Sequence, residues 1–135
     1  MKVIVSIPAY NEERDLKRVI EEIKSELDET SHQYQILVLD DGSVDQTVRI
    51  AKENGAIVFS NKSNRGLAFT FQREMEECLK LNPDIIIHTD ADGQYPALYI
   101  PKLIEKMQAG YDLILGSRFG KGNYSGSLSK KLGNM

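Results

Sequence analysis

Residues 84–96 read Asp-Ile-Ile-Ile-His-Thr-Asp-Ala-Asp-Gly-Gln-Tyr-Pro. The run of isoleucines ends at two aspartates that are separated by one residue, and a glycine follows them. A β-branched run bounded by turn formers is typical of a strand. An uninterrupted apolar run is expected where both faces of a parallel sheet are covered. The stretch therefore predicts a buried parallel strand whose carboxyl end carries Asp90 and Asp92.

Outward from this stretch, strand-like and helix-like segments alternate along the chain. Strands are predicted over residues 2–7, 35–39, 56–59 and 112–115, and helices over 16–27, 44–54, 66–81 and 100–107. In the first helical segment, apolar residues recur with the spacing of one helix face. This alternation indicates βαβ units. The predicted fold class is α/β, with a mostly parallel sheet and helices on both faces.

Two helix starts are predicted from local sequence. Asn11 is placed as the N-cap of the first helix, because asparagine accepts well from free amide groups there. Ser43 with Gln46 has the spacing of a capping box for the second helix.

Length, charge and composition limit the classes of protein. The chain has 135 residues and a formal net charge of −3, which argues against general nucleic-acid binding. Its single cysteine, Cys78, excludes an internal disulfide. No stretch approaches the roughly 20 apolar residues of a membrane helix. The chain as given is therefore expected to be cytoplasmic.

The composition changes near the C-terminus, where glycine, serine and basic residues dominate. We expect an α/β domain over residues 1–119. Residues 120–135 are expected to be a flexible basic tail or the start of a missing acceptor region, so that the chain looks truncated at this end.

Polar residues follow every predicted strand, where open parallel sheets bind ligands. In chain order they are Pro8-Ala9-Tyr10-Asn11-Glu12, Asp40-Asp41-Gly42-Ser43, residues 61–66, residues 90–94 and Gly116-Ser117-Arg118. Asp90 and Asp92, with the amide oxygen of Gln94, offer the hard oxygen ligands that suit Mg²⁺ or Mn²⁺. The alternative is a solvated turn built from ordinary turn-forming residues.

Asp40 is placed to accept hydrogen bonds from a base or a ribose, as acidic groups do in dinucleotide folds. His88 and Cys78 are interpreted as packing residues. Phe69 and Phe71 are interpreted first as helix-packing residues and second as a platform for base stacking.

Four of these motifs together resemble glycosyltransferase family 2. They are Pro8-Ala9-Tyr10-Asn11-Glu12, Asp40-Asp41-Gly42-Ser43, Asn64-Arg65-Gly66 and Asp90-Ala91-Asp92-Gly93-Gln94-Tyr95-Pro96. Their order and spacing follow the family over the whole chain. With Gly116-Ser117-Arg118-Phe119 after them, the chain most resembles the dolichyl-phosphate and polyprenyl-phosphate mannose synthase group. The resemblance implies a GT-A fold and a nucleoside diphosphate sugar as donor.

The resemblance also implies roles for particular residues. The nucleotide-binding set is Pro8, Ala9, Tyr10, Glu12, Asp40 and Asp90. The metal set, for Mg²⁺ or Mn²⁺, is Asp90, Asp92 and Gln94. The catalytic pair is Asp92 and Arg118, of which Arg118 matches an arginine that grips phosphate near the acceptor.

The implied reaction is inverting transfer of the sugar to a polyprenyl or dolichyl phosphate. A sugar hydroxyl as acceptor and a non-catalytic nucleotide-sugar-binding fragment stay open as alternatives. A lipid acceptor implies peripheral association of the full-length protein with the inner face of a membrane. A phosphoacceptor receiver domain fits less well, because its acidic pair follows the first strand, whereas Asp40 and Asp41 follow the second.

Overall fold

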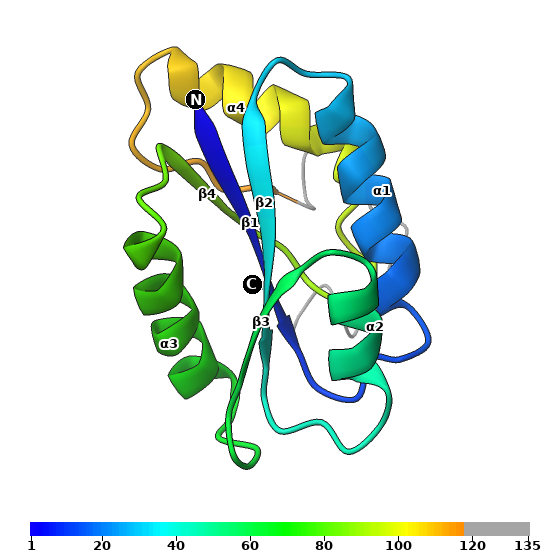
Figure 1. The fold of residues 1–135 in the computed structure, drawn as a ribbon. Coiled ribbons are helices and arrows are strands. Elements are labelled where there is room, and N and C mark those ends of the chain that lie inside the picture. Colours follow the sequence, from blue (N-terminus) through cyan, green and yellow to red (C-terminus); the bar gives the residue numbers. More distant parts are fainter. Residues whose placement is uncertain (118–135) are drawn as a thin grey trace, which may run out of the picture.

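The computed structural model describes residues 1–117 and contains a four-stranded sheet with helices on both sides (Figure 1). All strand pairs are parallel, in the order β3-β2-β1-β4. The strands are β1 (Lys2–Ala9), β2 (Gln33–Asp40), β3 (Ile57–Ser60) and β4 (Ile85–His88). The helices are α1 (Leu16–Asp28), α2 (Thr47–Glu53), α3 (Leu67–Lys80) and α4 (Ile100–Gln108), with a short 3₁₀ turn η1 (Ala97–Tyr99) before α4. The predicted α/β class is confirmed.

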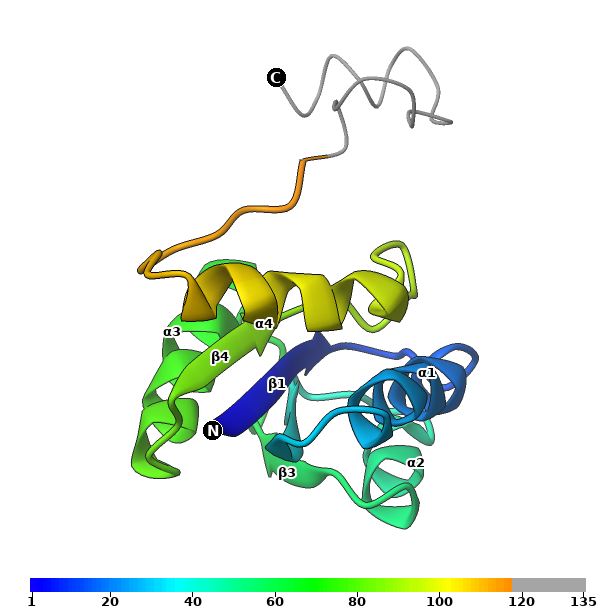
Figure 2. The same ribbon diagram turned by 90° about the horizontal axis from the view of Figure 1, so that it is seen from above.

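The helices divide between the two faces of the sheet (Figure 2). One core cluster joins alternate residues of β1, such as Val3 and Val5, to the apolar stripes of α1 and α4 and to Ala51 of α2. A smaller cluster on the opposite face joins Ile4 of β1 and residues of β2 to Cys78 of α3. The sheet is therefore the middle layer, with α3 alone among the described helices covering its second face.

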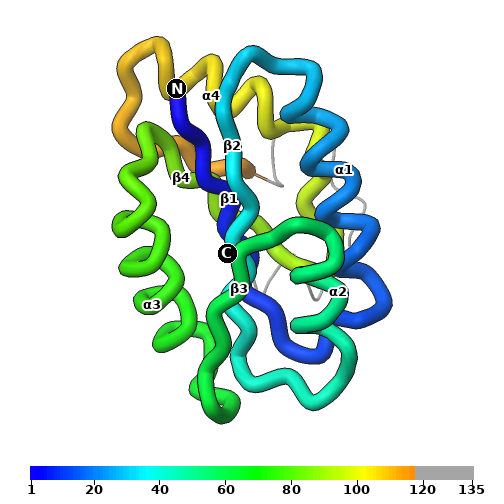
Figure 3. Tube along the Cα trace, in the orientation of Figure 1, coloured from blue at the N-terminus to red at the C-terminus, as the bar shows by residue number. Residues whose placement is uncertain are grey.

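Strand register brings the loops after the strands together. Ala9 at the end of β1 pairs with Asp40 at the end of β2, and Asp40 pairs with Ser60 at the end of β3. Ser6 of β1 pairs with His88 at the end of β4. The loops that follow β1, β2 and β3 consequently gather at one edge of the sheet, at the lower end of Figure 3.

The predicted strand over residues 112–115 is wrong, because these residues have no strand conformation. Leu113 and Leu115 are exposed to 73% and 80%. A strand needs a neighbour for its backbone amide and carbonyl groups, and within residues 1–117 the sheet ends at β4.

Both predicted helix caps are also wrong. Helix α1 begins at Leu16 after the N-cap Asp15, and α2 begins at Thr47 after the N-cap Gln46. Neither N-cap residue makes a side-chain capping bond. Asn11 instead adopts φ +52° in the loop that precedes α1.

No helix within residues 1–117 combines the length and the hydropathy that crossing a membrane requires.

Candidate functional site

A pocket lies at the carboxyl ends of the strands. Its lining comes from the loops after β1, β2 and β4 and from the loop and first turn of α3: Pro8, Ala9, Tyr10, Glu12, Asp41, Asn64, Gly66, Leu67, Thr70, Asp90, Ala91 and Asp92. The structure thus brings together most of the residues that the sequence singled out. Asp40 and Gln94 do not line the pocket, and Arg118 lies outside the described residues.

The loop after β1 is held by the loop after β2. The Asn11 amide donates to Ser43 Oγ at 2.9 Å, and the Val44 amide donates to Asn11 Oδ1 at 3.0 Å. The Glu12 amide donates to Thr47 Oγ1 at 2.8 Å. Side chains that local sequence assigned to helix caps therefore join two loops that are more than 30 residues apart. These bonds fix the backbone of residues 8–12 on the pocket.

Asp41 holds a third loop in place. It is 6% exposed, and its carboxylate accepts hydrogen bonds from the amides of Arg65 at 2.8 Å and Gly66 at 2.9 Å, and from Asn61 Nδ2 at 2.8 Å. Burial raises the pKa of Asp41, but these donated bonds outweigh burial and bring the pKa below its ordinary value. The ionised carboxylate therefore anchors the start of α3 on the pocket.

Sequence reasoning gave Asp41 and Thr70 no role. Thr70 is buried at the start of α3, and its Oγ1 accepts from Asn61 Nδ2 at 3.2 Å. The pair of adjacent aspartates at the end of β2, Asp40 and Asp41, was the feature of the sequence from which a role for Asp41 could have been inferred. Asp40 ends β2 and Asp41 follows it, and their carboxylates accept from different loops: Asp40 from the Ser43 amide, and Asp41 from donors within residues 61–66.

Asp40 is 2% exposed, and its Oδ1 accepts from the Ser43 amide at 3.0 Å. This bond closes the turn that follows β2. A contact between Asp40 and a base stays a prediction.

Asp90 and Asp92 follow β4 and reach the same pocket. Oδ1 of Asp92 accepts from the Gln94 amide at 2.9 Å, which closes a tight turn over Gly93. Both residues therefore line one cavity, while their role as metal ligands stays a prediction.

Several carboxylates lie close to Glu12. Burial raises the pKa of Glu12 above its ordinary value, and the negative charges of Asp92, Asp15, Asp45 and Asp90 raise it further. A cation bound near Glu12 and these aspartates would offset the repulsion between their negative charges.

The carboxylates on the pocket suit a metal ion that is shared with a bound ligand better than one that the protein holds alone. Within residues 1–117, no group of three or more His, Cys, Asp or Glu side chains is arranged to hold a metal by itself. Asp90 and Asp92 nevertheless offer hard carboxylate oxygens on an open pocket. Mg²⁺ is commonly bound by one or two carboxylates that are completed by waters and substrate phosphates. The two aspartates therefore suit Mg²⁺ or Mn²⁺ held jointly with a diphosphate.

His88 contacts α3, but its side chain is 35% exposed, so the core position that the sequence interpretation favoured is wrong. Its Nδ1 lies 3.1 Å from Oε1 of the buried Glu74, and its ring meets Phe71 edge-on with centroids 5.1 Å apart. The hydrogen bond from the protonated ring to the Glu74 carboxylate raises the pKa of His88 above its ordinary value. Phe69 lies under the Arg65 guanidinium, 4.4 Å from the ring centroid. The two phenylalanines thus have partners within the chain.

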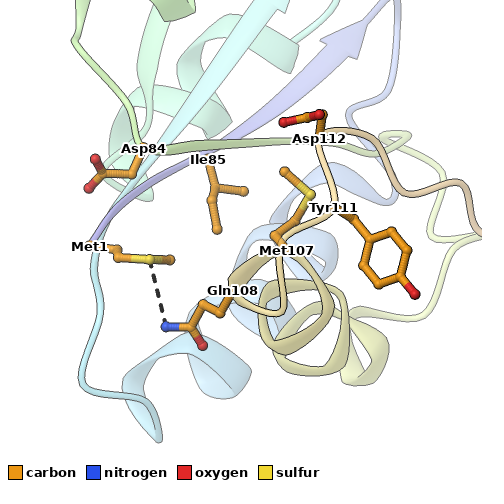
Figure 4. A pocket seen from close by; sticks show the side chains of 7 residues that line it. All are labelled: Met1, Asp84, Ile85, Met107, Gln108, Tyr111 and Asp112. Atoms are coloured by element: carbon orange, nitrogen blue, oxygen red, sulfur yellow. Dashed lines mark hydrogen bonds between the residues drawn. The ribbon is translucent and has the colours of Figure 1, made fainter.

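A second pocket lies at the opposite ends of the strands. Figure 4 shows its lining, which comes from the residues before β1 and β4 and from the end of α4: Met1, Asp84, Ile85, Met107, Gln108, Tyr111 and Asp112. Gln108 Nε2 lies 3.6 Å from the Met1 sulfur. This pocket contains none of the predicted site residues.

A family model described as glycosyl transferase family 2 matches residues 4–133. The chain is 36% identical to a dolichol-phosphate mannosyltransferase of Pyrococcus furiosus, over 90% of this chain and 34% of that protein. It is 32% identical to an undecaprenyl-phosphate 4-deoxy-4-formamido-L-arabinose transferase of Photorhabdus laumondii, over 96% of this chain and 40% of that protein. The chain spans less than half the length of both relatives.

Among solved structures, the fold is similar to glucosyl-3-phosphoglycerate synthase of Mycobacterium tuberculosis. The match to its complex with Mn²⁺, UDP and glucosyl-3-phosphoglycerate has a TM-score of 0.63 and 27% identity, over 78% of this chain and 39% of that chain. A complex of the same enzyme with Mg²⁺ and UDP matches with a TM-score of 0.62.

Proposed function

This chain belongs to glycosyl transferase family 2, and we propose that it binds a nucleoside diphosphate sugar whose sugar the protein transfers to a polyprenyl phosphate. The observation that carries the proposal is the shared pocket of the 8–12 loop, the start of α3 and the pair Asp90 and Asp92. The relatives named for dolichol phosphate and undecaprenyl phosphate support the choice of acceptor.

The nucleoside is assigned to the side of the pocket formed by the loop after β1. Pro8, Ala9, Tyr10 and Glu12 supply this wall. Tyr10 is half-exposed and offers an aromatic face. Asp40, at the end of the adjacent β2, is proposed to reach the base or the ribose.

The diphosphate is assigned to the end of β4. Asp90 and Asp92 would hold Mg²⁺ or Mn²⁺, with Gln94 beside them. When bound, the metal supplies positive charge that stabilises the leaving nucleoside diphosphate. Asp92 is pre-oriented for this role by its hydrogen bond from the Gln94 amide.

The transfer is a single displacement that inverts the anomeric carbon. An acceptor oxygen donates its electron pair to form the new bond, while the bond to the donor phosphate breaks and its electrons leave with the nucleoside diphosphate. A polyprenyl phosphate is already an anion, so the attack needs no general base, whereas a sugar hydroxyl would need one. Arg118 is proposed to grip the acceptor phosphate. With a lipid acceptor, the reaction would occur at the inner, cytoplasmic face of a membrane.

Calorimetry with UDP, GDP and CDP, each with and without Mn²⁺, tests donor binding. We expect one nucleotide to bind and Mn²⁺ to tighten it. Asp92→Asn should abolish the Mn²⁺ effect while the fold persists, and the exposed Asp112→Asn should change nothing. Asp40→Ala should weaken binding by about 1.5–3 kcal/mol with and without metal, as expected for a hydrogen bond to a charged group. If no nucleotide binds, the proposal is wrong.

A transfer assay distinguishes transfer to a lipid phosphate, transfer to a sugar hydroxyl, and nucleotide-sugar binding without transfer. A radiolabelled donor would be offered with undecaprenyl phosphate or with a sugar hydroxyl. Label in the lipid supports the proposal, and label in the sugar supports the alternative acceptor. Nucleotide binding without transfer to either would identify a nucleotide-sugar-binding unit, an outcome consistent with a chain that spans 34% and 40% of the two named relatives.

A further inference from the structure

Arg18 of α1 reaches across to the turn that carries Asp92. Its Nη2 lies 3.4 Å from the Asp92 carbonyl oxygen. The guanidinium is held in this direction by two carboxylates of its own helix, Asp15 and Glu22, each at 3.0 Å. Three acceptors from two elements therefore converge on one planar cation.

Gly93 leaves the space that the guanidinium uses. The residue has φ +76°, and a Cβ built on it would lie 2.6 Å from Nη2 and 2.9 Å from Nη1 of Arg18. Any other residue at this position would displace the guanidinium or the turn. The Arg18 guanidinium therefore occupies the space that a side chain at position 93 would need.

Asp92 is consequently held at two points. Arg18 contacts its carbonyl oxygen, and the Gln94 amide contacts its carboxylate. Asp92 lines the pocket together with Asp90. We propose that Arg18 is a positioning residue, which fixes the turn of residues 92–94 so that the Asp92 carboxylate meets the metal and the diphosphate. This inference rests on the proposed function.

The geometry of the guanidinium, more than its charge, explains why arginine suits position 18. Asp15 and Glu22 neutralise the guanidinium where it lies, so that Arg18 lends the pocket little net charge. Arginine presents five donors in a rigid fork, whereas lysine is a compact point charge. Lysine at position 18 would keep the charge and lose the simultaneous contacts. Lysine and glutamine should therefore have similar effects.

Calorimetry with whichever of UDP, GDP and CDP binds the unaltered chain tests this role. The measured quantity is the metal gain, which is the dissociation constant of that nucleotide without Mn²⁺ divided by that with Mn²⁺. Arg18→Lys and Arg18→Gln should each reduce the metal gain by about tenfold, the lower end of what loss of a supporting residue costs a metal site. Nucleotide affinity without Mn²⁺ and the melting temperature should stay near those of the unaltered chain. The control is Arg49→Gln, because Arg49 forms an equivalent helical ion pair with Glu53 on α2.

The outcomes separate the two proposals. An unchanged metal gain in both Arg18 variants would overturn the positioning role. A lower melting temperature with equal loss of affinity with and without Mn²⁺ would also overturn it, because it would indicate general support of α1. Full rescue by lysine would replace geometry with charge as the explanation. If the unaltered chain binds none of UDP, GDP and CDP, the proposed function fails, and the role of Arg18 with it.

Discussion

Asp41 shows how one buried carboxylate organises the pocket. Its pKa is lowered because backbone and amide donors surround the ionised form. Folding therefore favours the ionised carboxylate. This contribution to the free energy of unfolding is complete above the ordinary pKa near 3.8 and is lost as the pH falls through the lowered value.

Asp41→Asn should accordingly destabilise the chain at pH 7 by about 1.5–3 kcal/mol, the range for hydrogen bonds to a charged group. The difference from the unaltered chain should shrink as the pH falls below about 4. Urea unfolding at several pH values measures both effects. Asp112→Asn, at an exposed position, is the control. A difference that stays constant down to pH 2 would contradict the assigned cause.

Gly42 is required by both its backbone angle and its neighbours. It has φ +80°, and a Cβ there would lie 2.7 Å from the Ser63 carbonyl carbon and 2.8 Å from the Asn64 nitrogen. These are backbone atoms of the loop that leads to α3, so they cannot move aside as a flexible side chain can. The loops after β2 and β3 therefore touch through a residue that has no side chain.

Gly110 separates the two effects, because it has φ +105° with nothing within 4 Å of a built Cβ. Gly110→Ala should cost about 1–2 kcal/mol from the backbone alone. Gly42→Ala should cost about 1–3 kcal/mol more, as overpacking does. Denaturant unfolding of both variants gives the comparison. Equal losses would show that the loops can separate without cost.

At the scale of elements, the site depends on bonds between loops. The loop after β1 is bonded to the loop before α2 through Asn11 and Ser43, and to the first residue of α2 through Thr47. These bonds join the two loops into one wall of the pocket.

Ser43→Ala tests this wall. Loss of the bond from the Asn11 amide should lower the free energy of unfolding by about 1 kcal/mol and should leave the helical circular dichroism unchanged, since Ser43 does not cap α2. Ser31→Ala, at an exposed position, is the matched control. Loss of helical signal in proportion to stability would restore the capping role instead.

The sequence predicted the elements well and their ends poorly. The apolar runs of β1, β2 and β4 and the stripe of α1 are dictated by burial, which local pattern records. Asn11 and Ser43 looked like caps because their side chains accept hydrogen bonds from amides, but the amides involved belong to distant loops. Residues 112–115 had the composition of a strand, but composition cannot show that no strand among residues 1–117 pairs with them.

The same limit applies to the site. Asp90 and Asp92 could be placed from sequence, because they directly follow a buried strand. Asp41, Thr70 and Arg18 could not, because their partners lie on other elements. Contacts between elements arise from strand order and register, which no local window contains.

At the scale of the whole molecule, nucleotide binding should stabilise the fold. The pocket is built from loops of three strands and from the start of α3, and unfolding would disperse them. A ligand that binds only the folded chain adds about 2.7 kcal/mol at one hundred times its dissociation constant. The nucleotide that binds in the calorimetric comparison of UDP, GDP and CDP should therefore, with Mn²⁺, move the urea midpoint upward, and Asp92→Asn should remove the part of the shift due to Mn²⁺. A midpoint that none of the three nucleotides moves in the presence of Mn²⁺ would contradict binding to the folded state.

The thiol of Cys78 can report how often α3 detaches from the sheet. Cys78 is the single cysteine and is fully buried on the sheet-facing side of α3, and burial followed by the nearby charge of Glu74 raises the pKa of its thiol to about 11. An uncharged alkylating reagent can react only when α3 lifts from the sheet, so the labelling rate measures how often that helix detaches. Because the first turn of the same helix lines the pocket, the bound nucleotide with Mn²⁺ should slow the labelling of a thiol that it does not touch.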